Sequence, residues 1–194
     1  RDPRVGRDLL IGAPVGVSWA VLLYLSLVLA AWLGMPAELE RMGVLNNLLG
    51  ARRLVAHVIH EQQEAVIVCL YFLLVMLLLR SLLRNQWAAG TALVLLFTPM
   101  VGLGSASVLF WITVAACWIS FVWLMTRYGL LTLVAAFVSF RLMVMFPVTA
   151  DFSAWYWGES LVPLAVVAAI GAYGYYISLP GPTPPDDRLS ETRV

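Results

Sequence analysis

The sequence predicts an all-α, polytopic integral membrane protein with about six transmembrane helices and both termini in the cytoplasm. Of its 194 residues, 62% are hydrophobic and 12% are charged, whereas an ordinary soluble domain has about 25% charged residues. The mean hydropathy is +0.89, and the chain contains repeated apolar runs of the length that a bilayer needs, roughly 20 residues per helix. A soluble fold of this size would lack the polar surface to cover itself, so the lipid bilayer is the predicted surrounding.

The first predicted helix runs from about Leu9 to Gly34, with Pro14 in its first turns, where a missing amide hydrogen does least harm. Its apolar run of roughly 25 residues is longer than the core of about 7–15 residues in a secretory signal. A polar interfacial segment, 35–50, follows. A second helix is predicted from Ala51 to Leu83, because this stretch contains no helix breaker. Its second half, AVIVCLYFLLVMLLLRSLL, crosses the membrane.

The stretch 87–125 is too long for one span and has proline and glycine near its middle. It predicts a hairpin, with one helix ending at about Val101 and another beginning at about Ser105. The turn carries no charge, so a re-entrant hairpin is the alternative, since irregular backbone is tolerated at depth where protein covers it.

The last two predicted helices run from about Leu130 to Val148 and from about Leu161 to Leu179. Residues 1–181 form the predicted helical transmembrane domain. The proline-rich, charged tail 182–194 is predicted to be disordered.

Arginine placement predicts the orientation of the chain. There is no lysine, and the net charge of +1 gives no basic face for nucleic acid. With six spans, one group of arginines lies on the terminal side: Arg1, Arg4, Arg7, Arg80, Arg84, Arg127, Arg188 and Arg193. Only Arg41, Arg52 and Arg53 lie on the other side. The positive-inside rule then places both termini in the cytoplasm, in a bacterial plasma membrane.

The stretch HVIHEQQEA, 57–65, carries a polar stripe. On a helix, five polar side chains lie within about 100° of one another: Arg53, His57, His60, Glu61 and Glu64. The favoured interpretation is an amphipathic helix end at the outer interface. A metal site on His57, His60 and Glu64 is a weak alternative, because these side chains can chelate a divalent ion but do not complete H-E-x-x-H. A proton-linked sensor is the third, since histidine charges near neutral pH. No cofactor is predicted.

Arg141 stands inside a predicted span, in FVSFRLMVMFP. A guanidinium in the bilayer costs several kcal/mol, so it needs a partner or must reach the interface. The favoured interpretation is an ion pair with Glu64, Asp151 or Glu159; snorkelling and substrate binding are the alternatives. The predicted outer polar cluster comprises His57, His60, Glu61, Glu64, Arg141 and Asp151.

Three further patterns predict packing and interface positions. Trp155, Tyr156 and Trp157 are typical of an interfacial aromatic belt, with a ligand-stacking platform as the alternative. Cys69 and Cys117 lie in apolar runs, which predicts small packing residues and no disulfide framework or zinc knuckle. The GxxxG spacing of GAPVG, 12–16, favours close helix contact or a homodimer.

Four strings in the chain are RDPRVGRDLLIGA (1–13), RYGLLTLVAAFV (127–138), PVTADFSAWYWGESL (147–161) and GYYISLPG (174–181). Together they resemble the multi-span membrane region that follows the catalytic domain in a group of bacterial serine/threonine protein kinases, of the kind common in acidobacteria. The resemblance implies a cytoplasmic kinase domain upstream, which would suit a start at Arg1 without methionine. The chain has no H-R-D, D-F-G or V-A-I-K, so no catalytic residue is carried over.

The predicted function is therefore a non-catalytic membrane anchor and sensor or oligomerisation module of a bacterial signalling protein. One alternative is a small permease or transporter subunit, which would need a polar path across the bilayer. Another is a membrane-integral metal hydrolase using His57, His60 and Glu64. The predicted partners are the bilayer, a second copy of the chain and the upstream kinase domain.

Overall fold

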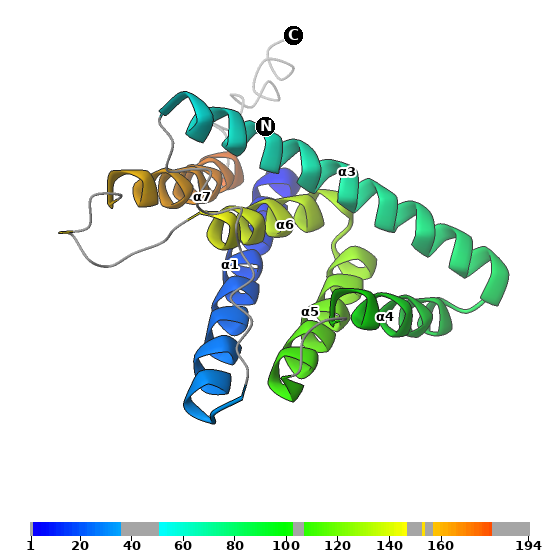
Figure 1. The fold of residues 1–194 in the computed structure, drawn as a ribbon. Coiled ribbons are helices and arrows are strands. Elements are labelled where there is room, and N and C mark those ends of the chain that lie inside the picture. Colours follow the sequence, from blue (N-terminus) through cyan, green and yellow to red (C-terminus); the bar gives the residue numbers. More distant parts are fainter. Residues whose placement is uncertain (1, 36–50, 103–106, 147–152, 154–156, 180–194) are drawn as a thin grey trace, which may run out of the picture.

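The computed structural model describes residues 2–35, 51–102, 107–146, 153 and 157–179 (Figure 1). Within these residues the chain forms helices and no strands. The helices are α1 (Pro3–Trp32), α3 (Ala51–Leu83), α4 (Gln86–Gly102), α5 (Val108–Arg127), α6 (Leu130–Met145) and α7 (Trp157–Ser178). The prediction of an all-helical chain is confirmed for this part. The predicted tail at 182–194 lies outside it.

Four of the helices are long and apolar enough to cross a membrane: α1, α3, α5 and α7. The other two, α4 and α6, have 17 and 16 residues. At about 1.5 Å per residue they are slightly shorter than a hydrocarbon core of about 30 Å. These lengths and compositions support the prediction of an integral membrane protein.

The start of α1 differs from the prediction for a local reason. The Asp2 carboxylate accepts a hydrogen bond from the Arg4 amide at 2.9 Å, and Pro3 follows as the first helical residue. This cap begins the helix before Leu9, and it places Pro14 in the helix interior rather than in the first turns. There Pro14 cannot donate to the carbonyl four residues earlier, while the Ser18 hydroxyl donates to the Pro14 carbonyl at 2.8 Å.

Glycines bring α1 into backbone contact with its neighbours. A Cβ added at Gly16 would stand 1.9 Å from the Ala136 carbonyl oxygen of α6, and one added at Gly6 would stand 2.5 Å from the Gly174 oxygen of α7. Small residues permit such close approach. The GxxxG pattern, in which Gly12 also faces α6, is therefore used for packing within the chain.

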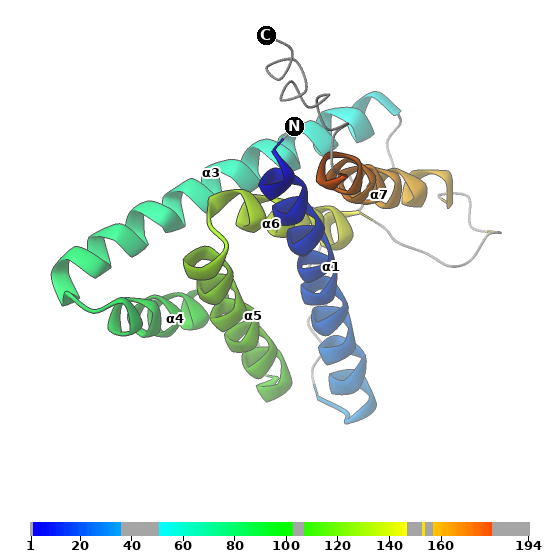
Figure 2. The ribbon, with the colours of Figure 1, turned by 180° about the vertical axis from the view of Figure 1, so that it is seen from behind.

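Figures 1 and 2 show α6 between α1 and α3, with α3 crossing near the amino-terminal end of α1 instead of running beside it. The most extensive contact in the fold is between α1 and α6, and α3 packs mainly on α6 and α4. The two helices of the predicted hairpin, α4 and α5, pack on each other. Their turn, 103–106, lies outside the described residues.

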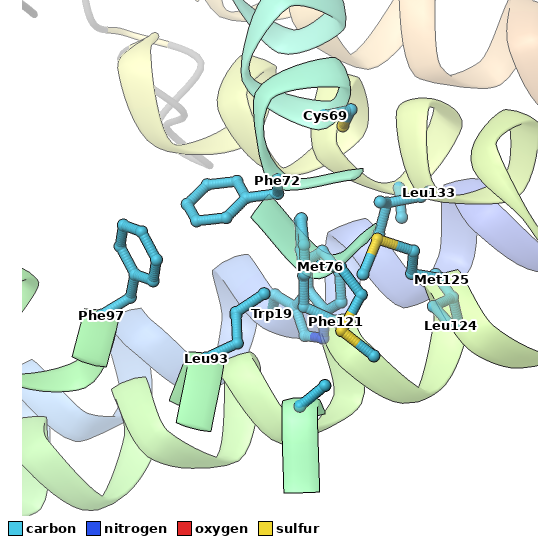
Figure 3. Close-up of a cluster of buried hydrophobic side chains, with 12 residues drawn as sticks. Trp19, Cys69, Phe72, Met76, Leu93, Phe97, Phe121, Leu124, Met125 and Leu133 are labelled. Carbon is cyan, nitrogen blue, oxygen red and sulfur yellow. The ribbon is translucent and has the colours of Figure 1, made fainter. Parts of the chain in front are cut away.

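The main apolar core joins α1, α3, α4, α5 and α6 through aromatic rings (Figure 3). The Phe72 ring meets those of Phe97 and Trp118 edge-on, each with centroids 4.7 Å apart. The Trp19 indole Nε1 donates to Ser120 Oγ at 2.7 Å. Both cysteines are free thiols, and Cys69 is fully buried in this core, as expected for a packing residue.

Candidate functional site

An ion pair inside the protein links α3 to α6. Arg141 Nε donates to Glu61 Oε2 at 2.5 Å. The Glu61 side chain is only 3% exposed, and that of Arg141 is 21% exposed. The predicted outer cluster contained both residues, although the carboxylates predicted to pair with Arg141 were Glu64, Asp151 and Glu159. The structure places Glu61 in that role.

The position of Glu61 follows from the buried face of α3. The buried residues along this helix are Leu54, Glu61, Ala65, Cys69, Phe72 and Met76. They are three, four or seven positions apart, which places them on one helix face. Glu61 therefore occupies an apolar seam against α6, and Arg141 supplies the compensation that a buried charge needs. The interpretation of the stripe as a solvated helix end does not hold for this residue.

His57 lies one turn before Glu61 and touches it. Its Nε2 is 3.3 Å from Glu61 Oε1, but the geometry does not make a hydrogen bond, and this buried nitrogen has no hydrogen-bond partner among the described residues. The imidazole also packs on the Phe146 ring, with centroids 5.3 Å apart. His57 therefore packs against the ion pair, but its Nε2 forms no hydrogen bond with Glu61.

His60 extends the cluster to the protein surface. Its ring stacks on that of His57, with centroids 6.2 Å apart and an interplanar angle of 3°. His60 is exposed and Glu64 is partly buried. The stacked rings therefore connect the exposed face of α3 to the Glu61 carboxylate.

The remaining predicted site residues are Asp151 and the three aromatic residues at 155–157. Asp151, Trp155 and Tyr156 lie outside the described residues. Trp157 is the first residue of α7 rather than part of a loop, and it is half-buried. Within the described segments, no group of three or more His, Cys, Asp or Glu side chains is placed to hold a metal ion.

A large apolar cavity adjoins the ion pair. Its volume is about 690 Å³, and among the described residues of its lining Arg141 is the one with a charge. Trp19, Phe97 and Trp118 contribute to the apolar part of the lining. The lining residues come from α1, α3, α4, α5 and α6. The sequence does not predict this cavity, because an apolar run does not indicate which of its faces remain unpacked.

Comparison with protein-family models, with curated proteins and with solved structures finds no match to this chain. Functional assignment therefore depends on the chemistry of the residues themselves. The site offers a guanidinium fixed by a carboxylate, two stacked imidazoles and an adjacent apolar cavity. These groups can bind or orient a charged partner.

Proposed function

We propose that this chain is a non-catalytic membrane anchor and sensor module of a bacterial signalling protein. It crosses the plasma membrane six times with both termini in the cytoplasm, and it is joined to an upstream catalytic domain of the serine/threonine kinase kind. The long apolar helices, the arginine distribution and the resemblance to kinase membrane regions support this proposal.

The observation that carries the sensor role is the buried pair of Glu61 and Arg141. Ionisable groups within the membrane region are costly and commonly mark functional sites. Replacing a buried pair by apolar residues is often neutral or stabilising, so such a pair is weak evidence for a purely stabilising role. A pair between two helices can instead select one helix packing, and a stimulus acts by favouring one packing over another.

Side-chain and helix contacts connect this ion pair to the protein surface on one side and to α1 on the other. On one side, Glu61 touches His57, which stacks on the exposed His60. On the other side, Arg141 belongs to α6, which packs along α1 through the glycine contacts. A shift of α6 relative to α3 would therefore reach α1, the helix nearest to the proposed upstream domain.

Cysteine labelling tests the topology. His60→Cys and Asp151→Cys are placed in a Cys69→Ala/Cys117→Ala background and treated with a membrane-impermeant thiol reagent in intact cells. Six spans place both positions outside, so both should be labelled without permeabilisation. Labelling of the two positions from opposite faces would overturn the six-span arrangement and the outer cluster.

The source gene upstream of Arg1 tests the signalling role. A kinase domain encoded there supports the proposal, and a start codon within a few residues counts against it. If the kinase is present, autophosphorylation of the full-length protein is compared for wild type, Glu61→Gln and Glu61→Gln/Arg141→Gln. Gln63→Ala, at an exposed position of the same helix, is the matched control. If folded Glu61 variants kept wild-type autophosphorylation, the sensor role would be excluded and only the anchor role would remain.

A further inference from the structure

The cavity beside the ion pair has the size and lining of a ligand site. Its volume of about 690 Å³ lies within the range of small-molecule sites, roughly 300–1,000 Å³. Such sites are mostly apolar and have a few polar groups that fix the orientation of the ligand. The rings of Trp19, Phe72, Trp118 and Phe140 contribute to the apolar wall.

The charged residue that lines the cavity, Arg141, is held in place by Glu61. Among the described residues, Arg141 makes its hydrogen bond to Glu61 through Nε. A guanidinium has five N–H donors, so the terminal nitrogens retain four. Glu61 thus anchors the guanidinium, and no described residue accepts a hydrogen bond from its terminal N–H groups. These groups can form a two-point contact with an anionic head group.

We propose that this cavity binds a long-chain fatty acid, with the carboxylate on Arg141 and the acyl chain along the aromatic wall. A carboxylate matches the planar fork of a guanidinium in a two-point contact. A volume of about 690 Å³ accommodates one acyl chain. The inference goes beyond the anchor and sensor role and does not depend on it, because binding requires only the folded membrane chain.

Tryptophan quenching measures this binding directly, since Trp19 and Trp118 line the cavity. The purified full chain, in neutral detergent micelles, is titrated with dibromostearic acid, its methyl ester and a dibromo-phosphatidylcholine. We expect saturable quenching by the acid at one molecule per chain. Charge-assisted hydrogen bonds contribute about 1.5–3 kcal/mol, so the acid should bind about tenfold or more tightly than the ester.

Two adjacent positions on α5 supply the matched variants. Thr113 lines the cavity and Ile112 does not; Ile112 is 61% exposed. Thr113→Phe should fill the cavity and abolish saturable quenching, whereas Ile112→Phe should bind like wild type. The double variant Glu61→Gln/Arg141→Gln, which leaves no unpaired buried charge, should bind the acid no more tightly than the ester.

Several results would overturn the proposal. Equal affinity for the acid and the ester would remove the role of Arg141 as the head-group site, and this comparison needs no variant. Saturable quenching by the phosphatidylcholine with none by the acid would identify bilayer lipid as the occupant. Wild-type quenching in a folded Thr113→Phe protein would place the fatty acid elsewhere.

Discussion

Arg141 and Glu61 are separated by 80 positions in the sequence, yet Arg141 Nε lies 2.5 Å from Glu61 Oε2 between α6 and α3. The carboxylate is almost completely buried. Without its partner, each group would leave an uncompensated charge in an apolar environment. The pair therefore makes the packing of these two helices depend on both residues together.

Removing one member of the pair should destabilise the protein more than removing both. Breaking a buried pair costs about 3–5 kcal/mol, so Glu61→Gln and Arg141→Gln should each lower the free energy of unfolding by about 3 kcal/mol. The double variant should lie closer to wild type than either single variant. Unfolding by denaturant titration in detergent gives the four free energies, and the double-mutant cycle gives the coupling.

His60→Gln is the control for this cycle. His60 is exposed and its ring meets that of His57, and surface substitutions usually change stability by less than about 0.5 kcal/mol. If the Glu61 and Arg141 variants changed stability no more than His60→Gln, the pair would not hold the two helices together.

The helices could be predicted from the sequence where apolar runs have clear ends. The bounds of α3 agree with the prediction, because no breaker interrupts the run from Ala51 to Leu83. The early start of α1 was not predicted, since it depends on the Asp2 side chain capping the helix at Pro3. The crossing of α3 over α1 was also beyond prediction, because the second half of α3 is apolar on every side and gives no signal for its contacting face.

The sequence predicted which residues belong to the site, but it did not predict which of them pair with each other. Helical spacing placed Glu61 and Glu64 on the same stripe, and the cost of a buried guanidinium predicted that Arg141 needs a partner. Choosing between two carboxylates one turn apart requires the register of α3 against α6, which is a tertiary property. The cavity arises between five helices, so no local pattern in the sequence indicates it.

Gly16→Ala should destabilise the protein, although alanine is normally the better helix residue. The added Cβ would stand 1.9 Å from the Ala136 oxygen, which forces α1 away from α6, and overpacking typically costs about 1–3 kcal/mol. Gly171→Ala is the matched control, because a Cβ there meets nothing within 4 Å. It should be neutral or stabilise by up to about 1 kcal/mol. Thermal unfolding in detergent distinguishes the two, and similar melting temperatures would contradict the close α1–α6 contact.

Trp19→Phe should weaken the junction of α1 and α5. It removes the hydrogen bond from Nε1 to Ser120 Oγ, which is 2.7 Å long, while keeping an aromatic ring in the core. Side-chain hydrogen bonds between transmembrane helices contribute about 0.6 kcal/mol on average, so we expect a loss of about that size plus a contribution from reduced packing. Trp32→Phe, at a position 85% exposed, should change nothing. Equal stability of the two variants would show that the indole bond is not formed.

The amino terminus and the α5–α6 junction should lie on the same side of the membrane. The Arg7 guanidinium stands 5.8 Å from the centre of the Tyr128 ring, so Arg4→Cys and Arg127→Cys, both at exposed positions, should react with an impermeant thiol reagent from the same face. Trp32→Cys provides the opposite control. The 30 residues of α1 extend about 45 Å, which is more than the core of about 30 Å.

All three variants are made in the Cys69→Ala/Cys117→Ala background and compared in intact and permeabilised cells. Cytoplasmic termini require that positions 4 and 127 react only after permeabilisation and that position 32 reacts before it. Reaction of positions 4 and 32 from the same face would mean that α1 does not cross the bilayer. Reaction of positions 4 and 127 from opposite faces would contradict the Arg7–Tyr128 contact, because both groups lie at one end of the helix assembly.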